Sequence, residues 1–468
     1  MKTDGFSVGA VIQGPVPVPG SKSIAQRALV AAAFAHGTTE VVGLPPSDDV
    51  LRALGVARAV GARFPSAGRA DDPFVDALLR RRGQGRLTGA PPLVSDAARS
   101  WCTAEVGESG TLARLSTALL GLARPAGSGA SIVPAGSLAR RRSPALFAAL
   151  RAAGAGVEHV PGAEHGWPVM LTAPPRVRTV RLVSPTSSQE VSALLMALAA
   201  HEGVSRLEVF GGIPSEPYVG LTLDLLDRFG VGLERLPPDR AYDSDPERVP
   251  SHAYVVGGPL RAPEEPLVIE PDASSAAVAL AAGCLTGGEV FVEGLGAASL
   301  QPDLACIEVL RAFGCHAAAE PGRWIAAGRP DRGVELDLEH APDLAPVAAA
   351  LAADVALRGL QRSRLTGLGT LPGKESQRIA VLARGLAALG VATEHGPDWL
   401  ALAPAPAVRR AAQPILLDPA GDHRMAFAFA LMSLVVPDVR VERPDCVAKS
   451  WPTFWSDLAA CGAQRAAR

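Results

Sequence analysis

The chain has 468 residues, of which 48% are hydrophobic and 20% are charged, a composition that is typical of globular proteins and excludes a disordered one. This length exceeds one ordinary hydrophobic core, so two domains of roughly 200 residues each are expected. The formal net charge of -2 gives no global field that would attract nucleic acid, so any recognition of anions must come from cations gathered locally.

The six cysteines form no Cys-x-x-Cys pair and have no histidine at zinc-ligand spacing, so we predict reduced thiols with no disulfide framework and no metal site. Residues 1–23 lack a basic region followed by an apolar stretch, and the Ala-rich runs of the chain are interrupted by polar residues or Gly. A soluble, cytoplasmic protein without a membrane partner is therefore expected.

Taken in chain order, the sequence repeats one pattern six times: a polar motif, an Ala- and Leu-rich helix, a short strand and an amphipathic helix ending near Gly. The first helices are apolar nearly all round, as buried helices are, and are expected at 24–36, 111–123, 188–200, 273–285, 343–357 and 423–435. The strands are expected at 38–44, 130–136, 205–212, 288–294, 363–369 and 439–445. The amphipathic helices are expected at 51–64, 143–156, 219–232, 304–316, 379–391 and 453–463.

Six such units predict an α/β fold with two similar domains of three units each. A Pro- and Glu-rich stretch at 260–275 leads into the fourth unit, which places one crossover between the domains near residue 270. The second crossover is expected near residue 20. One domain then comprises 21–269 and the other 1–20 plus 270–468, and such a double crossover suits a hinge that closes over a ligand.

Polar residues collect just before the buried helices, as SKS at 21–23, GESGT at 107–111, SSQ at 187–189, DASS at 272–275, PD at 342–343 and DHR at 422–424. Helix starts offer free N–H groups and a partial positive charge to anions, although a single Ser or Asp there is more simply an N-cap. Capping does not explain the cations in or beside these motifs: Lys22, Arg27, Arg114, Arg141, Lys374, Arg378, Arg424 and Lys449. They predict a site for small, multiply anionic substrates.

Three carboxylates stand among these cations: Asp272, Asp343 and Glu375. Carboxylates and lysines beside a substrate suit proton transfer, and structural ion pairing accounts for the same residues equally well.

These motifs together resemble the 5-enolpyruvylshikimate-3-phosphate (EPSP) synthase family almost from end to end. The matching segments are VPGSKSIAQRALVAAAFA, GESGTLAR, ARRRSP, SPTSSQ, SEPY, DASSA, HAPDLAP, KESQR, DHRMA and CVAKSWP. The resemblance implies two domains of three βαβαββ units with buried parallel helices, the inside-out barrel of the enolpyruvyl transferases. It also implies a monomer, no cofactor, and two small-molecule substrates, shikimate 3-phosphate and phosphoenolpyruvate.

Carried over position by position, the resemblance assigns the shikimate carboxylate to Ser23 and Arg27. The 3-phosphate goes to Ser187, Ser188, Ser215 and Lys374, with Gln189 and Tyr218 assisting. Phosphoenolpyruvate goes to Lys22, the Gly110 amide, Arg141, Arg378, Arg424 and Lys449, with Arg114 in the same motif as Gly110. Asp272, His423 and Thr370 lie in or beside matched motifs as further site residues.

The implied reaction adds the 5-hydroxyl of shikimate 3-phosphate to C2 of phosphoenolpyruvate as C3 is protonated, and a tetrahedral ketal phosphate then loses phosphate. Asp343 is the expected base toward the 5-hydroxyl, and Lys22 and Glu375 are expected to move protons at C3 and the bridging oxygen. Glu108 stands where the family has Asn. An unpaired carboxylate about 4 Å from an anion costs on the order of 4 kcal/mol at an effective dielectric near 20.

Further departures are Thr370 for Asn, Gln377 for Asp, Leu115 for Pro, and Glu216 and Gly220, which break the family's SKPYxD pattern. They leave open a paralogous lyase that eliminates phosphate from shikimate 3-phosphate with Glu108 as its base. A non-catalytic binding protein and a different cyclic polyol phosphate as acceptor also remain open. A UDP-N-acetylglucosamine carboxyvinyltransferase is disfavoured because GSLARRRSP lacks the cysteine of that enzyme's mobile loop.

Overall fold

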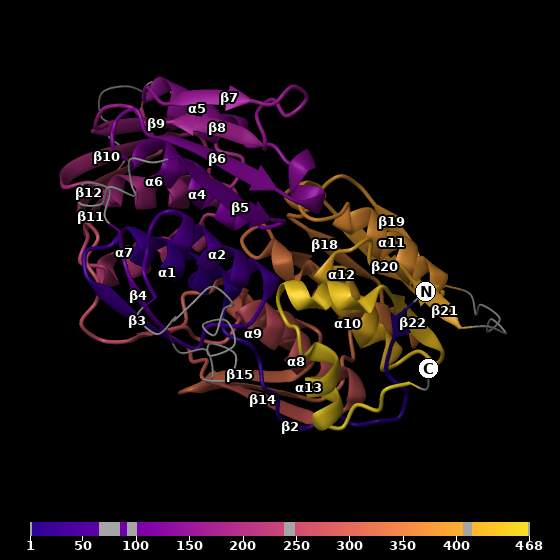
Figure 1. Cartoon of the computed structure of the whole chain (residues 1–468). Coiled ribbons are helices and arrows are strands. Elements are labelled where there is room, and N and C mark those ends of the chain that lie inside the picture. The colour runs from indigo at the N-terminus through magenta and orange to yellow at the C-terminus, as the bar shows by residue number, and fades with distance from the viewer. Residues whose placement is uncertain (1, 65–84, 91–100, 238–248, 406–413, 467–468) are drawn as a thin grey trace. The chain divides into compact units, whose positions relative to one another are not determined.

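The structure is a computed structural model that describes residues 2–64, 85–90, 101–237, 249–405 and 414–466. The chain divides into two compact units, one comprising residues 21–269 and the other residues 1–20 together with 270–468 (Figure 1). Each unit repeats the same arrangement of short sheets, buried helices and amphipathic helices. The predicted α/β fold of repeated units is therefore confirmed.

Within the described part of unit 21–269, three helices are buried on nearly every side: α1 (Lys22–Phe34), α4 (Gly110–Leu122) and α6 (Ser188–Ala199). Each is built from Ala and Leu with few polar residues, so burial of all faces costs little. The amphipathic helices bury one face only and are α2 (Asp48–Ala59), α5 (Pro144–Ala152) and α7 (Pro217–Arg228). The polar motifs therefore lie at the starts of buried helices.

The sheets of unit 21–269 follow the βαβαββ pattern. In the second repeat, β5 (Cys102–Gly107) and β6 (Gly129–Pro134) are parallel, and the antiparallel strands β8 (Val169–Thr172) and β7 (Gly156–His159) follow in the order β5-β6-β8-β7. The third repeat has the order β11-β12-β10-β9, with β9 (Thr179–Val183), β10 (Gly203–Phe210), β11 (Gly232–Leu236) and β12 (His252–Gly258). A parallel pair joined by a helix crossover thus positions α4 and α6.

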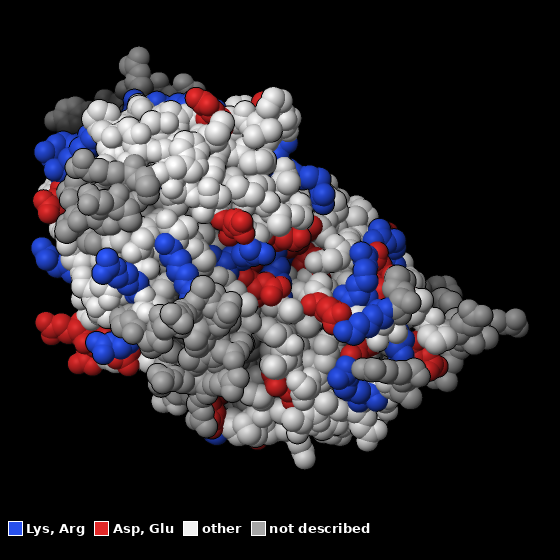
Figure 2. All heavy atoms as spheres, in the orientation of Figure 1, with Lys and Arg blue, Asp and Glu red and all other residues white. Residues whose placement is uncertain are grey.

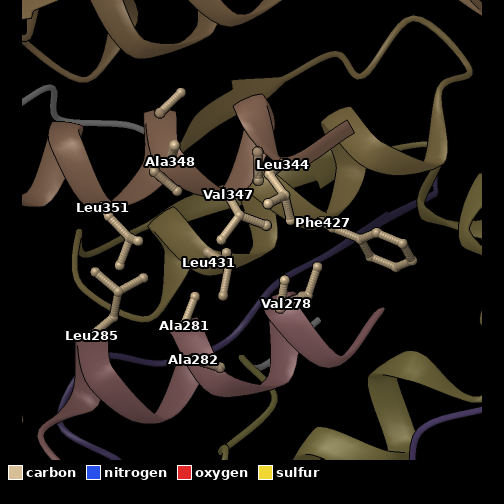
Figure 3. Close-up of a cluster of buried hydrophobic side chains, with 14 of the residues drawn as sticks. Val278, Ala281, Ala282, Leu285, Leu344, Val347, Ala348, Leu351, Phe427 and Leu431 are labelled. Atoms are coloured by element: carbon tan, nitrogen blue, oxygen red, sulfur yellow. The ribbon is translucent and has the colours of Figure 1, made fainter. Parts of the chain in front are cut away.

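In the other unit, α8 (Ala273–Thr286), α10 (Ala345–Leu357) and α12 (His423–Ser433) form the core. Figure 3 shows Val278, Ala281 and Leu285 of α8 facing Val347 and Leu351 of α10 and Leu431 of α12. The amphipathic helices are α9 (Cys306–Ala312), α11 (Arg378–Ala388) and α13 (Phe454–Ala460). Alanine dominates α8 and α10, which lets the helix backbones approach closely.

The sheets of this unit have the orders β15-β16-β14-β2, β17-β18-β20-β19 and β1-β22-β21. Their N-terminal strands are β1 (Thr3–Asp4) and β2 (Gly14–Pro15). The others are β14 (Glu289–Glu293), β15 (His316–Glu320), β16 (Arg323–Ala327), β17 (Glu335–Asp337), β18 (Ser363–Thr366), β19 (Ala392–His395), β20 (Leu400–Ala403), β21 (Ile415–Leu417) and β22 (Val439–Glu442).

Two short strands pair with repeats that are remote from them in the sequence. β2 precedes α1 in the chain but pairs in parallel with β14, next to α8. β13 (Leu267–Val268) precedes α8 but pairs in parallel with β3 (Thr38–Val42), which follows α1 and is also paired with β4 (Gly85–Thr88). The unit that contains α8 therefore begins with a strand from the far N-terminus.

Each amphipathic helix ends two residues before a glycine with positive φ, at Gly61, Gly154, Gly230, Gly314, Gly390 and Gly462. Glycine adopts this left-handed conformation without the steric cost of a Cβ atom, and it closes the helix C-terminus. The expected C-terminal glycines are confirmed in every repeat.

On the face shown in Figure 2, basic and acidic side chains lie interspersed. Across the described ranges, no helix combines the length and the apolar character needed to cross a membrane.

Candidate active site

The start of α1 brings Lys22, Ser23 and Arg27 together. The Nζ of Lys22 lies 3.2 Å from Oδ2 of Asp49, the second residue of α2. Arg27 is 2% exposed and donates from Nε to Thr222 Oγ1 at 2.8 Å and from Nη1 to the Ser23 carbonyl at 2.9 Å. Burial lowers the pKa of Arg27 to about 10, against an opposing effect of Tyr218, so the guanidinium stays charged at neutral pH.

The residues expected at the 3-phosphate lie at the starts of α6 and α7. Ser187 is the N-cap of α6 and accepts from the Gln189 amide at 3.2 Å, and the Ser188 amide donates to the Pro214 carbonyl at 3.1 Å. This last bond brings the turn at Ser215, whose φ is +54°, next to the start of α6. Ser187, Ser188, Ser215 and Tyr218 are thus brought together, whereas Lys374 belongs to the other unit.

Gly110, at the start of α4, lies against two arginines. A Cβ atom on this glycine would stand 2.9 Å from Nη1 of Arg141 and 3.0 Å from Nη1 of Arg114. Arg114 is 8% exposed and donates to the Gly110 carbonyl and to Gln189 Oε1, both at 3.1 Å. Burial lowers the pKa of Arg114 to about 10, while Glu190 opposes that shift. The glycine therefore allows two guanidinium groups to reach one helix start.

Glu108 lies beside these arginines and is linked to Arg141 by hydrogen bonds through Ser137. Its Oε2 accepts from the Ser137 hydroxyl at 3.1 Å, and that hydroxyl accepts from Nη2 of Arg141 at 3.3 Å. Gly136, with φ of +50°, lies so close that a Cβ there would collide with the Glu108 carboxylate. Glu108 is therefore linked to Arg141 through the Ser137 hydroxyl and is not the isolated carboxylate for which the full cost would apply.

In the unit that contains α8, cations and carboxylates form one connected network. Asp343 Oδ1 lies 2.9 Å from Nη1 of Arg378 and 3.7 Å from Nζ of Lys374, and its Oδ2 lies 3.0 Å from Nη2 of Arg424. Glu375 lies 2.7 Å from Nη2 of Arg378 and 3.0 Å from Nζ of Lys449. Four of the cations predicted from the sequence thus meet around Asp343 and Glu375.

Arg378 holds the centre of this network and is only 1% exposed. Its Nε donates to Asp422 Oδ2 at 2.8 Å, its Nη1 to Asp343 and its Nη2 to Glu375. All three nitrogens are therefore engaged with carboxylates, and an incoming anion would compete with these carboxylates for the charge of Arg378. Among the described residues, Arg424 and Lys374 each form an ion pair with Asp343 alone.

The network shifts the ionisation of its members. Burial works against the charge of Asp343, but Arg424, Lys374 and Arg378 outweigh it and hold the pKa of this carboxyl well below its ordinary value. Burial lowers the pKa of Lys374, although Asp343 opposes that shift. Asp343 is therefore ionised and Lys374 gives up its proton more easily than a surface lysine.

The three further site residues have different surroundings. Asp272 caps α8, since its Oδ1 accepts from the Ser275 amide at 2.8 Å. His423 is 2% exposed and packs edge-on against Phe427, with ring centroids 6.0 Å apart. Thr370 ends the turn before Leu371, and its hydroxyl is buried without a hydrogen bond among the described residues.

Sequence reasoning missed several residues that complete the network. Asp49 pairs with Lys22, and Asp422 pairs with Arg378 and caps α12 by accepting from the Arg424 amide at 3.0 Å. Asp49 lies in the first turn of α2 and Asp422 in the polar motif before α12, and these positions at helix starts are the signal that could have found them. Asp303 accepts from the Ser274 hydroxyl, which in turn accepts from Arg424 at 3.1 Å. The isolated acid in LQPDL carried no such signal.

The fold is that of the enolpyruvyl transferases. EPSP synthase from Acinetobacter baumannii superposes with a TM-score of 0.72 over 99% of both chains at 22% identity. The enolpyruvyl transferase NikO from Streptomyces tendae superposes with a TM-score of 0.68 over 99% of this chain and 98% of that one, at 17% identity.

Sequence comparison defines the family within this fold. The model of EPSP synthase (3-phosphoshikimate 1-carboxyvinyltransferase) matches residues 7–458. The 3-phosphoshikimate 1-carboxyvinyltransferases of Cellvibrio japonicus and Methanopyrus kandleri are each 34% identical, over 95% and 96% of both chains respectively. That of Laribacter hongkongensis is 35% identical over 96% of this chain and 97% of its own. The chain belongs to the EPSP synthase family.

Proposed function

We propose that this protein transfers the enolpyruvyl group of phosphoenolpyruvate to the 5-hydroxyl of shikimate 3-phosphate and releases phosphate. The observation that carries the proposal is the match to the EPSP synthase family across residues 7–458. Relatives named 3-phosphoshikimate 1-carboxyvinyltransferase, at 34–35% identity, support it. The cations that such anionic substrates need stand at the starts of buried helices, where backbone N–H groups add to their charge.

For the acceptor, we assign the carboxylate to Ser23 and Arg27 and the phosphate to Ser187, Ser188, Ser215 and Lys374, with Gln189 and Tyr218. The shared location of the serines at the starts of α6 and α7 supports this assignment. Arg27 is held by Thr222 and by the Ser23 carbonyl, so its orientation is set before a carboxylate arrives. Such preorganisation lowers the entropic cost of binding.

For phosphoenolpyruvate, we assign Lys22, the Gly110 amide, Arg114, Arg141, Arg378, Arg424 and Lys449. Asp343 is assigned as the base toward the 5-hydroxyl, and Lys22 and Glu375 as the groups that move protons at C3 and the bridging oxygen. Lys374 and Arg424 hold down the pKa of Asp343. Substrate anions that bind these cations would weaken that hold, so the basicity of Asp343 rises when the ligands arrive.

The elimination of phosphate from shikimate 3-phosphate is not favoured by the family relationship, and Glu108 already serves as the acceptor for Ser137. Product analysis with shikimate 3-phosphate, with and without phosphoenolpyruvate, tests the proposal. Transfer requires both substrates and yields an enol ether together with inorganic phosphate. Phosphate release from shikimate 3-phosphate alone would overturn the proposal.

Three further expectations belong to this proposal. The crossovers at 20–21 and 269–270 act as a hinge, the protein is a monomer, and it works in the cytoplasm. Small-angle scattering tests the hinge, because both substrates together should reduce the radius of gyration. An unchanged radius would count against closure.

A further inference from the structure

Glu190 is a fully buried carboxylate that none of the steps proposed above uses. It is the third residue of α6 and has 0% exposure. Its carboxylate accepts from the Thr186 amide at 2.7 Å and the Thr186 hydroxyl at 3.1 Å, which closes the helix start much as a capping box does. It also accepts from the Ser143 hydroxyl at 2.5 Å, a residue 47 positions away. The bond from Ser143 does not contribute to capping α6.

Ser143 precedes α5 at the position where serine usually caps a helix. In the described structure its side chain makes no capping bond to α5. Its hydroxyl instead donates to Glu190 and accepts from Nε of Arg114 at 3.1 Å. A hydroxyl has one proton and two lone pairs, so it can serve both partners at once. We call this arrangement of Arg114, Ser143 and Glu190 the serine bridge.

The serine bridge extends to Gln189. Nη1 of Arg114 donates to Oε1 of Gln189 at 3.1 Å. A guanidinium has donors only, so the oxygen end of the Gln189 amide must face Arg114 and its NH2 group must face elsewhere. Glu190, acting through Ser143 and Arg114, thereby sets which end of Gln189 is offered to a ligand.

A neutral hydroxyl between the two charges has an electrostatic advantage. Among the described residues, no carboxylate oxygen forms a direct ion pair with Arg114, whereas Arg378 contacts three carboxylates directly. A guanidinium that is oriented through a hydroxyl keeps more of its attraction for an anionic ligand.

The same sequence of groups occurs at two other arginines. Nη2 of Arg141 donates to Ser137, which donates to Glu108. Nη2 of Arg424 donates to Ser274, which donates to Asp303. The recurrence at arginines from two different repeats, one in each unit, argues that the serine bridge is more than an accident of packing.

We propose that Glu190 is a positioning residue for anion binding in unit 21–269. Through Ser143 it orients Arg114, and through Arg114 it turns the Gln189 amide toward the phosphate of the acceptor. The identity of the ligand rests on the proposed function, whereas the serine bridge itself does not.

A double-mutant cycle on the full chain tests this proposal with Glu190→Gln, Ser143→Ala and the combined variant. Each single change should raise the KM for shikimate 3-phosphate about tenfold and alter kcat less than about threefold, because ground-state binding is what loses orientation. The combined variant should be no worse than either single one, since all three break the same bridge. An unchanged KM, or effects that multiply to about a hundredfold, would overturn the proposal.

Asp354 provides the matched control. It is also a buried carboxylate, 2% exposed, and it binds Arg329 at 2.8 Å and Arg358 at 3.0 Å at the other end of its helix from the polar motif. Asp354→Asn should lower the melting temperature and leave the KM unchanged. An equal rise of KM in this variant would mean that general loosening, and not the serine bridge, explains the effect.

Hydrogen exchange at Arg114, which does not depend on turnover, tests the serine bridge separately from the proposed function. In protein with 15N-labelled arginine, the Nε–H signal of Arg114 can be assigned by its loss in Arg114→Lys. Its exchange with water should accelerate at least about fivefold in both Ser143→Ala and Glu190→Gln, because the hydrogen bond that protects it is lost or weakened. If exchange accelerates in both variants but the wild type forms no product from the two substrates, the proposed function alone is wrong. Normal turnover with unaltered exchange and KM would sink the serine bridge alone.

Discussion

Gly110 and Arg141 touch so closely that the glycine has no room for a side chain: a Cβ atom would lie 2.9 Å from Nη1 of the arginine. Gly110→Ala must therefore displace Arg141, Arg114 or both. We expect the KM for phosphoenolpyruvate to rise about tenfold, equivalent to about 1.4 kcal/mol of binding energy. Steady-state kinetics with phosphoenolpyruvate as the varied substrate measures this change in KM.

Gly121 in the same helix is the control for this change. A Cβ there would meet Leu150 at 3.5 Å and Leu171 at 3.7 Å, which are ordinary contacts. Gly121→Ala should leave the KM unchanged. If both alanine variants raised the KM equally, the close approach at Gly110 would not be the cause.

Replacing Arg378 should destabilise the protein strongly. Arg378→Gln leaves Asp343, Glu375 and the fully buried Asp422 without their shared partner, and we expect the free energy of unfolding to fall by about 3–5 kcal/mol. Urea unfolding followed by circular dichroism measures the change. Arg228→Gln, which breaks an exposed pair with Asp224, should cost less than about 1 kcal/mol. Equal losses in the two variants would contradict the central role of Arg378.

Asp303 should make stability depend on pH. Burial raises its pKa to about 6, although Arg424 opposes that shift. The native state then binds the proton more tightly than the unfolded chain, whose aspartates titrate near 4. The contribution of Asp303 to the free energy of unfolding is therefore present in full below about pH 4 and is lost as the pH rises through about 6.

Asp303→Asn removes this titration. Relative to the variant, the wild type should lose on the order of 1–3 kcal/mol of unfolding free energy between pH 4 and pH 7. Urea titrations of both proteins at intervals across this range measure the difference, in which other titrating groups largely cancel. A difference that stayed constant with pH would show that Asp303 titrates at an ordinary value.

Removing the charge of Glu108 should preserve transfer. The amide of Glu108→Gln can still accept from Ser137, while the negative charge beside the arginines disappears. We expect kcat/KM for phosphoenolpyruvate to stay the same or rise up to about tenfold. Glu105→Gln, on strand β5 just before Glu108 and with its side chain largely exposed, should change nothing. Loss of all activity in Glu108→Gln would instead support an elimination with Glu108 as its base.

The repeated pattern of the sequence predicts the fold well, because each buried helix carries its own apolar composition and each amphipathic helix its terminal glycine. The start of α10 shows the limit. A helix was expected from residue 343, whereas residues Pro342–Leu344 form a 3-10 turn and α10 begins at Ala345. Pro346 lacks an N–H and fixes its own φ, so it fits the first helical turn and favours this later start.

Some residues of the candidate site can also be predicted from the sequence, and others cannot. Residues at helix starts, such as Lys22 and Arg424, can be picked from the sequence because the repeat marks their positions. The partners that orient them cannot, since Ser143 meets Glu190 and Ser274 meets Asp303 only after separate segments have packed together. Nor does a sequence reveal that one arginine, Arg378, is enclosed by three acids.

The exchange of β2 and β13 between the repeats has a consequence for synthesis on the ribosome. Unit 21–269 receives its closing strand β13 from its own last residues, so it can complete its sheets from one continuous stretch of nascent chain. The other unit cannot, because β1 and β2 emerge first and their partners β22 and β14 emerge much later. β2 therefore stays without its partner until β14 has followed the whole of unit 21–269, and β1 stays without its partner until β22 has been made.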